Sequence, residues 1–260
     1  MTDYPQITFY DISCTVTSEP WSPYTARTYL ALRLLGIPFE RHMLPMARIH
    51  PTLSAAGVTR ALAGRHTLPA LTVSSGNDKQ WVTESDDIAA YLQKLYLEHG
   101  GSLATSLFPD ASAKELVEKV RDCFKSGLYQ GDRWKSIVPP VYNILEPESQ
   151  QFFLETRTES WGKSPKDILA TDAVANEERD GGVDQLYAKV LQPFSELYAA
   201  KEKQEGVWLG GERAVYPDLM TLALLQWMKC ANGDAFERGL KLVGGTLEQA
   251  WIAGQTLFKE

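Results

Sequence analysis

The stretch from Thr67 to Leu92 constrains the fold of this chain more than any other part of the sequence. A short apolar run that contains a proline is followed by a turn cluster, SSGND, and by a second run, QWVT. Two such runs joined by turn-forming residues predict an antiparallel β-hairpin. The residues that follow have the spacing of a helix with one buried face, so we predict strand, turn, strand and helix in this order. The apolar positions of this helix are Ile88, Tyr91, Leu92, Leu95 and Tyr96.

Two features of this stretch point to binding chemistry. A proline within a strand belongs on a sheet edge, and a cis peptide bond at Pro69 is one way to seat it in a tight bend, with the backbone groups of Leu68 turned outward. Ser85 stands where the helix begins, and the unpaired N–H groups there suit a carboxylate, while Glu84 offers an anion for an ammonium group. Taken singly, Ser85 is explained as a helix cap and Pro69 as an edge-strand proline. Taken together, these residues would hold the α-amino-acid end of a small peptide.

The residues before this stretch predict a βαβ unit. Ile7–Ile12 is rich in β-branched and aromatic residues and suits a strand. Ser22 suits the N-cap of the next helix, Pro23 suits its first position, and Gly36 ends it. Residues 39–44 suit a second strand, parallel to the first. With a short helix and loops in between, the hairpin and its helix complete a βαβ-ββα domain, which is the thioredoxin-like plan.

The second half of the chain is helical in character. Apolar stripes at helical spacing run from Leu116 to Phe124 and from Val183 to Tyr198, the second with a possible kink at Pro193. The helix that begins near Tyr216 is apolar on all sides, which predicts a central position in its domain. We therefore expect an α/β domain at residues 1–98, a linker at 99–110 and an all-helical domain at 111–260.

Composition narrows the class of protein. A chain of 260 residues and 29.0 kDa is large enough for two domains, and a mean hydropathy of -0.25 is that of a soluble globular protein. The net charge of -7 argues against binding nucleic acid through a general basic surface. Three widely separated cysteines suggest reduced thiols, and four histidines without metal-ligand spacing suggest no metal. Without a signal segment or a membrane-length apolar run, we expect a cytoplasmic protein that binds neither membrane nor nucleic acid.

The order of motifs around the hairpin resembles the glutathione-binding half of a glutathione transferase. The resemblance covers the whole chain and implies a thioredoxin-like domain followed by an all-helical domain, with glutathione as co-substrate and a homodimeric assembly. It implies that Pro69 is cis, that the Leu68 backbone pairs with the cysteinyl unit of glutathione, and that Glu84 and Ser85 grip the γ-glutamyl end. One departure is Val215, because the family usually has Ser or Thr three residues before the Asp that begins its central helix.

A narrower resemblance points to the etherase-like fungal transferases. These are related to bacterial β-etherases, which cleave lignin aryl ethers with glutathione. The blocks that are similar are Trp21-Ser-Pro, Arg27-Thr28, Leu107-Phe108-Pro109, Phe152-Phe153, Thr156-Arg157 and Trp161-Gly162-Lys163.

Ser22 is the candidate for activating the thiol of glutathione. A thiol with a pKa of about 8.5 is only a few per cent thiolate near neutrality. A hydroxyl at a helix N-terminus can donate to the sulfur anion, and roughly 1.5–3 kcal/mol from such a hydrogen bond lowers the pKa by about one to two units. Serine-type members of the family use this position in that way. The alternative is that Ser22 is only an N-cap, and Cys14, Ser13 and Thr15 are weaker candidates because they precede the helix and lack its dipole.

Two positions that follow Ser22 depart from the narrower family. Tyr24 stands where related proteins commonly have Asn, and Ala26 stands where they commonly have Trp. Tyr24 could supply a second hydroxyl near the sulfur or block part of the site, and Ala26 would leave room for a ligand. The acceptor should bind between the domains, where aromatic side chains could form walls or could belong to the core. The candidates for these walls are Tyr129, Trp134, Tyr142 and Trp161.

The leading hypothesis is a cytoplasmic glutathione transferase of the serine type that conjugates or thiolyses small aromatic or phenolic electrophiles, possibly aryl ethers. One alternative is a ligandin, which binds glutathione and hydrophobic phenolics with little or no turnover. A structural or regulatory member of the fold is a third possibility. The intact pairs Leu68-Pro69 and Glu84-Ser85 argue against the third, because such a member needs no peptide site.

Overall fold

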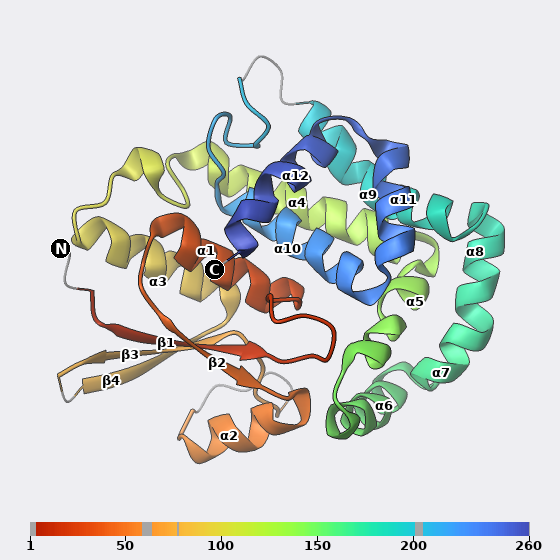
Figure 1. The fold of residues 1–260 in the computed structure, drawn as a ribbon, viewed down its shortest axis with the longest axis horizontal. Helices are drawn as coiled ribbons and strands as arrows, with labels where there is room; N and C mark the ends of the chain where they lie inside the picture. Colours follow the sequence, from red (N-terminus) through yellow and green to blue (C-terminus); the bar gives the residue numbers. More distant parts are fainter. Residues whose placement is uncertain (1–3, 59–63, 77, 201–204, 260) are drawn as a thin grey trace.

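The computed structural model describes residues 4–58, 64–76, 78–200 and 205–259. Its N-terminal part contains a four-stranded sheet in the order β2-β1-β3-β4 (Figure 1). β1 and β2 are parallel, whereas β3 is antiparallel to both β1 and β4. The thioredoxin-like arrangement predicted from the sequence is confirmed. The strands are β1 (Gln6–Ile12), β2 (Glu40–Leu44), β3 (Ala70–Ser75) and β4 (Asp78–Thr83).

Helices cover both faces of this sheet. α1 (Pro23–Leu35) and α3 (Ser85–Glu98) lie on one side, and α2 (Ile49–Ala55) lies on the other side beyond the short helix η1 (Met46–Arg48) (Figure 1). α1 begins and ends as its sequence predicts. Pro23 occupies its first position, and Gly36 follows its end with a φ of 64°, a left-handed conformation that glycine adopts without a steric penalty.

Pro69 corrects one expectation. The sequence suggested a proline inside an edge strand, but Pro69 immediately precedes β3, which lies between β1 and β4. A proline has no N–H for the ladder, and the first paired residue of the strand is therefore Ala70, which lies opposite Tyr10. The Leu68–Pro69 peptide bond is cis, as the family resemblance implies.

The rest of the chain forms the predicted helical domain (Figure 1). α4, α9 and α10 pack together at its centre, and α10 also packs against α1 of the sheet domain. The helices are η2 (Leu103–Thr105), α4 (Ala111–Tyr129), η3 (Gln130–Asp132), α5 (Trp134–Ile137), η4 (Pro139–Ile144), α6 (Pro147–Trp161), α7 (Pro165–Ile168), η5 (Leu169–Ala173), α8 (Val174–Asp180), α9 (Val183–Ala199), α10 (Tyr216–Ala231), α11 (Gly233–Val243) and α12 (Gly245–Phe258). Among the described residues, no helix is both long and apolar enough to cross a membrane.

The start of α10 shows how the chain manages without a hydroxyl at Val215. The Asp218 carboxylate, three residues into the helix, accepts a hydrogen bond from the Val215 N–H at 2.9 Å. It also accepts from the Leu209 N–H and from the Tyr198 hydroxyl, both at 2.8 Å. One buried carboxylate therefore satisfies the N-cap backbone, the preceding loop and α9 together, which fixes the start of the central helix.

Candidate active site

The register of the sheet brings the predicted binding motifs to one end of it. Tyr10 lies opposite Ala70, and Ala70 lies opposite Thr83. The Leu68–Pro69 bond directly precedes Ala70, and Glu84 directly follows Thr83, so both motifs leave the sheet at the same end. β1 also ends there at Ile12, and its chain continues through a loop to Ser22 at the start of α1.

The Ser22 hydroxyl is not used to cap α1. The side chain is buried, with 6% of the residue exposed, and the backbone carbonyl accepts a hydrogen bond from the Ala26 N–H at 2.8 Å. Across α1, all of which the structure describes, no N–H donates to the hydroxyl. The hydrogen bond that an N-cap serine would make is therefore missing, and the hydroxyl stands at the positive end of the helix dipole.

The Leu68 backbone lies outside the β-ladder. Ladder pairing of β3 begins at Ala70, and no described residue makes a hydrogen bond to the Leu68 N–H or C=O. The Leu68 side chain is buried in the core, which anchors the segment. Both backbone groups are therefore available to an extended peptide that lies alongside them.

Glu84 has an uncommon backbone conformation between β4 and α3. Its φ is 67° and its ψ is 123°, and it is the N-cap of α3, with Ser85 as the first helical residue. A non-glycine residue with positive φ persists where its surroundings determine it, and such residues cluster at functional sites. Ser85 is buried, and its carbonyl accepts a hydrogen bond from the Tyr216 hydroxyl at 3.1 Å.

Asp86 joins this turn to the helical domain. Its carboxylate lies 2.6 Å from the Arg121 guanidinium of α4 and accepts a hydrogen bond from the Tyr216 hydroxyl of α10 at 3.0 Å. It also lies 3.5 Å from the Arg27 guanidinium of α1. Sequence reasoning missed this cluster, although Asp86 adjoins Ser85 and Arg27 belongs to one of the etherase-like blocks. The cluster fixes the start of α3 against both α1 and the helical domain.

A cavity of about 340 Å³ lies between the two domains beside this cluster. Tyr24 and Arg27 face it from α1, and the Arg27 guanidinium lies over the Tyr24 ring, 4.8 Å from its centre. Tyr129 faces it from the end of α4; its side chain is exposed as a whole, but partial desolvation of its hydroxyl raises the pKa. The cavity can take a small ligand with an apolar body. Its other walls include Phe124, Phe194, Met220 and Leu224.

The structure separates the remaining acceptor candidates from this cavity. Ala26 is fully buried on the inner face of α1. Trp134 and Trp161 contact each other edge to face, with ring centres 5.0 Å apart, and Tyr142 lies beneath the Lys166 ammonium, 4.9 Å from its ring centre. None of these four residues lines the cavity. Of the predicted aromatic walls, Tyr129 lines the cavity together with Tyr24, whereas Trp134 and Trp161 form a separate pair.

The alternative nucleophiles have other roles in the fold. The Cys14 thiol donates to the Thr17 carbonyl at 3.5 Å, and burial raises the pKa of this thiol. The Ser13 hydroxyl donates to Glu146, and the Thr15 hydroxyl donates to the Ile144 carbonyl at 3.1 Å. These hydroxyls tie the loop after β1 to the helical domain. Among the described residues, no three His, Cys, Asp or Glu side chains are placed to hold a metal ion.

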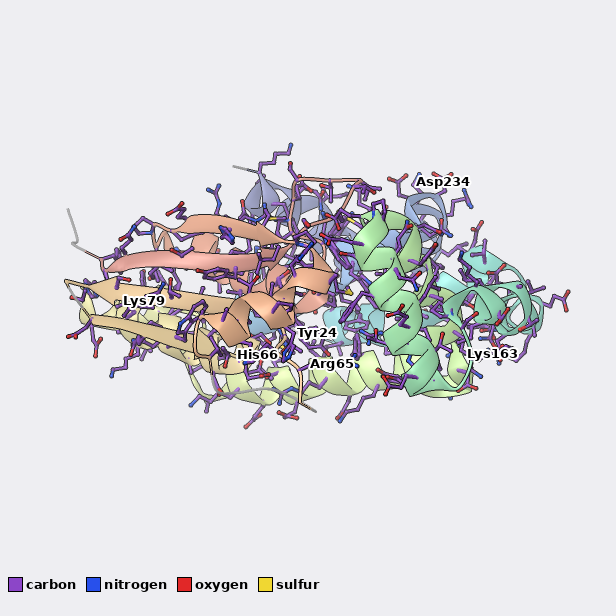
Figure 2. All side chains as sticks on the ribbon, turned by 90° about the horizontal axis from the view of Figure 1, so that it is seen from below. Tyr24, Arg65, His66, Lys79, Lys163 and Asp234 are labelled. Atoms are coloured by element: carbon purple, nitrogen blue, oxygen red, sulfur yellow. The ribbon has the colours of Figure 1, made fainter. Side chains whose placement is uncertain are left out.

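Two histidines brace the segment before Leu68, which the sequence did not reveal. His66 Nε2 donates to the Val58 carbonyl at 2.6 Å, and the His66 backbone N–H donates to His50 Nδ1 at 3.2 Å. Because His50 lies on α2, these bonds tie α2 to the residues that lead into Leu68. Figure 2 shows His66, Arg65 and Tyr24 near the boundary between the sheet and the helical domain.

Comparison with known proteins identifies the family of both domains. Residues 21–95 match the family described as "Glutathione S-transferase, N-terminal domain", and residues 120–253, more than half of the chain, match "Glutathione S-transferase, C-terminal domain". Glutathione S-transferase-like protein ustS of Aspergillus flavus is 24% identical over 262 residues, which cover 97% of this chain and 91% of the relative.

Solved structures of fungal proteins share the fold. Glutathione transferase GSTFuA3 from Phanerochaete chrysosporium superposes with a TM-score of 0.75 at 21% identity, over 99% of each chain. Glutathione S-transferase CsGST83044 of Ceriporiopsis subvermispora, solved in complex with glutathione, gives a TM-score of 0.74 at 21% identity, over 98% of this chain and 100% of that one.

Proposed function

The chain belongs to the glutathione S-transferase family, and on that premise we propose that it activates the thiol of glutathione for attack on small aromatic or phenolic electrophiles. One observation carries this proposal. The Ser22 hydroxyl, unused as a cap, stands at the start of α1, and the loop that leads to it leaves the sheet at the same end as Leu68-Pro69 and Glu84-Ser85.

The tripeptide would lie along this end of the sheet. The Leu68 N–H and C=O would pair with its cysteinyl unit, as an added strand pairs with a free edge. The α3 N-terminus at Ser85 would take the γ-glutamyl carboxylate, and the Glu84 carboxylate would take the ammonium group. Glutathione in the complex with CsGST83044 supports the tripeptide as co-substrate.

The Ser22 hydroxyl would donate a hydrogen bond to the thiolate. Such a bond, together with the dipole of α1, favours the charged form of the sulfur and lowers its pKa by about one to two units. The thiolate then attacks the electrophilic carbon of the acceptor, a carbon–sulfur bond forms, and the leaving group departs as an anion. The Tyr24 hydroxyl is a second candidate donor, because Tyr24 follows Ser22 by two residues at the mouth of the cavity.

Several narrower assignments belong to this proposal. The blocks around Trp21, Phe152 and Trp161 support a serine-type, etherase-like enzyme, and aryl ethers are then acceptors that release a phenolate. We expect a cytoplasmic homodimer, on the grounds of the family resemblance. The acceptor would use the interdomain cavity at Tyr24 and Tyr129, with the pair Trp134–Trp161 as a further aromatic surface.

A ligandin is the second candidate, because the same cavity combines apolar walls with exposed tyrosines. Turnover separates the two functions. A transferase should conjugate a model aryl halide, or cleave a model aryl ether, at a rate that saturates with glutathione and exceeds the uncatalysed reaction. Calorimetry on the same preparation should show glutathione binding. Binding of glutathione and phenolics without turnover of either model compound would establish the ligandin instead.

A further inference from the structure

Arg157 on α6 is a cation for which the described part of the chain supplies no anionic partner. Among the residues that the structure describes, its guanidinium makes no ion pair or hydrogen bond, although the residue is half-buried. The sequence explains why. Residues four positions apart face each other on a helix, and the neighbours of Arg157 at that spacing are Phe153 and Trp161. Its guanidinium lies 5.3 Å and 6.0 Å from the centres of these two rings.

A second guanidinium adds to the positive charge at this place. Arg65, from the sheet domain, lies over the ring of Phe152 on α6 at 5.8 Å. Its ion-pair partner is Glu159, at 3.4 Å and with both side chains largely exposed, which makes a weak pair. Burial and the charge of Arg65 both lower the pKa of Arg157. The two guanidinium groups therefore lie over the rings of adjacent residues of α6, Arg65 over Phe152 and Arg157 over Phe153. Glu159 is the one carboxylate paired with either of them among the described residues, and it is loosely held.

Aromatic rings lie beside both cations. Trp161 contacts Phe153 with ring centres 6.0 Å apart and contacts Trp134 at 5.0 Å. A guanidinium group that lies over an aromatic ring can still bind a carboxylate through two parallel hydrogen bonds at its N–H edge. At Arg65 a ligand carboxylate would compete with the exposed Glu159. A ligand with an aromatic body and a carboxylate would satisfy both kinds of surface at once.

The position suits a ligand that reaches the thiol site. Arg65 precedes Leu68 by three residues, and three residues span at most roughly 10 Å. Figure 2 shows Arg65 near the boundary between the two domains, as it does Tyr24. A substituted benzoate is of comparable length, so its carboxylate can sit at Arg65 and Arg157 while its ring extends toward the end of the sheet.

We propose that Arg65 and Arg157 form a subsite for the carboxylate of an aromatic acceptor, so that the preferred substrates are aromatic acids rather than neutral arenes. The role of this subsite in choosing the acceptor rests on the proposed transferase function. Its binding of a carboxylate does not, because binding is measured without turnover. The glycine carboxylate of glutathione is another source of the same chemistry, and the experiment separates the two sources.

Equilibrium binding of an unreactive pair of ligands tests the subsite without turnover. 4-Nitrobenzoate and 4-nitrobenzamide have similar shapes and differ in charge, and calorimetry measures their affinities for the full chain. Arg157→Gln should weaken the benzoate roughly tenfold or more, as expected for loss of a charged hydrogen-bonding partner, and should leave the benzamide within about twofold. Arg157→Lys keeps the positive charge but lacks the paired N–H donors of the guanidinium group. Its affinity for the benzoate should lie between those of wild type and Arg157→Gln.

Arg48→Gln is the matched control. It also removes one arginine charge, at the contact between η1 and α6 where Arg48 and Glu148 form an exposed ion pair at 2.9 Å, and it should leave both affinities unchanged. If the ratio of the affinity for the benzoate to the affinity for the benzamide is the same in wild type and in Arg157→Gln, the subsite assignment is wrong. Loss of glutathione affinity in Arg157→Gln, with the benzoate unaffected, would assign the pair to the tripeptide and overturn the acceptor assignment.

Turnover then tests the link to catalysis. With 4-chloro-3-nitrobenzoate the thiolate sulfur bonds to the ring carbon, the carbon–chlorine bond breaks and chloride leaves, and the amide analogue reacts in the same way. Arg157→Gln should raise KM for the acid and leave KM for the amide unchanged. If Arg157→Gln weakens 4-nitrobenzoate as expected while neither wild type nor any variant turns over 4-chloro-3-nitrobenzoate or its amide, the subsite stands and the transferase proposal fails.

Discussion

Asp180 offers a test of how the helical domain is held together, because its carboxylate joins three segments. It is the last residue of α8 and accepts hydrogen bonds from Arg133, before α5, at 3.0 Å and from Lys189 of α9 at 3.1 Å. Its neighbour Arg179 lies 3.1 Å away. Only 4% of the Asp180 side chain is exposed, so solvent screens these interactions weakly.

The contribution to stability follows from the pKa. Burial alone would raise the pKa of Asp180, but hydrogen bonds from Arg179, Lys189 and Arg133 outweigh it and lower the pKa from 3.8 to about 2. A difference of about 1.8 pH units, at 1.36 kcal/mol per unit, corresponds to roughly 2.4 kcal/mol. Because the folded-state pKa is depressed, this stabilisation is fully present above about pH 4 and is lost as pH falls through about 2. Asp180→Asn should therefore lower the free energy of unfolding at neutral pH by about 2 kcal/mol.

Denaturant unfolding across pH measures this effect. The curves for wild type and Asp180→Asn should be separated at pH 7 and should approach each other as pH falls from about 4 toward 2. The control is Asp122→Asn, because Asp122 forms an exposed pair with Lys125 at 3.7 Å and should cost less than about 0.5 kcal/mol. A constant separation at every pH would refute the electrostatic reasoning, since it would show that the loss does not depend on ionisation of Asp180.

Two further variants test the binding site and the packing of the domain. The double variant Glu84→Ala and Ser85→Ala should lose most of its affinity for glutathione in calorimetry while its circular dichroism is unchanged, and retention on glutathione resin at wild-type strength would remove the γ-glutamyl assignment. Gly127→Ala should destabilise the fold by about 1–3 kcal/mol in denaturant unfolding, because a Cβ there would clash with the Val190 carbonyl oxygen where α4 meets α9. Unchanged stability of Gly127→Ala would mean that the two helices can separate without cost.

The sheet domain could be predicted well from local signals. Gly36 ends α1, Pro23 begins it, and Gly76, with a φ of 62°, follows the end of β3, because each of these residues acts through its own backbone. The strands extend into the predicted turn cluster, since Ser74 and Ser75 belong to β3 and Asp78 begins β4. The position of Pro69 was less certain. A proline can sit within an edge strand or before any strand, and only pairing between distant strands decides between the two.

The helical domain could be predicted in outline but not helix by helix. α10 was evident because it is apolar on all sides and central. α6 was not predicted, because its buried face combines Phe153 with Ser149 and Thr156, and such a polar mixture gives no apolar stripe. The cap of α10 also required the fold, since Asp218 meets Leu209 and Tyr198 only after α9 and α10 have packed.

The candidate site shows the same division. Motif order suggested Ser22, Leu68, Glu84 and Ser85, and sheet register explains how three of them meet at one end of the sheet. The ion pairs of Asp86 link residues far apart in the sequence, and no local pattern reports such contacts. The aromatic candidates could not be sorted in advance, because an aromatic residue on a helix suits a cavity wall and a core equally well.

Titration of bound glutathione tests the central claim most directly, namely that the Ser22 hydroxyl stabilises the thiolate. Ultraviolet absorbance of the thiolate, followed against pH at saturating protein, gives the pKa of the bound thiol in wild type, Ser22→Ala and Tyr24→Phe. Ser22→Ala should raise this pKa by about one to two units, lower conjugation near neutral pH roughly ten- to a hundredfold, and recover activity as pH rises. Tyr24→Phe keeps the ring beside the cavity and should leave the pKa of the bound thiol unchanged. Superimposable titrations of wild type and Ser22→Ala would contradict the account, and a shift in Tyr24→Phe alone would move the role to Tyr24.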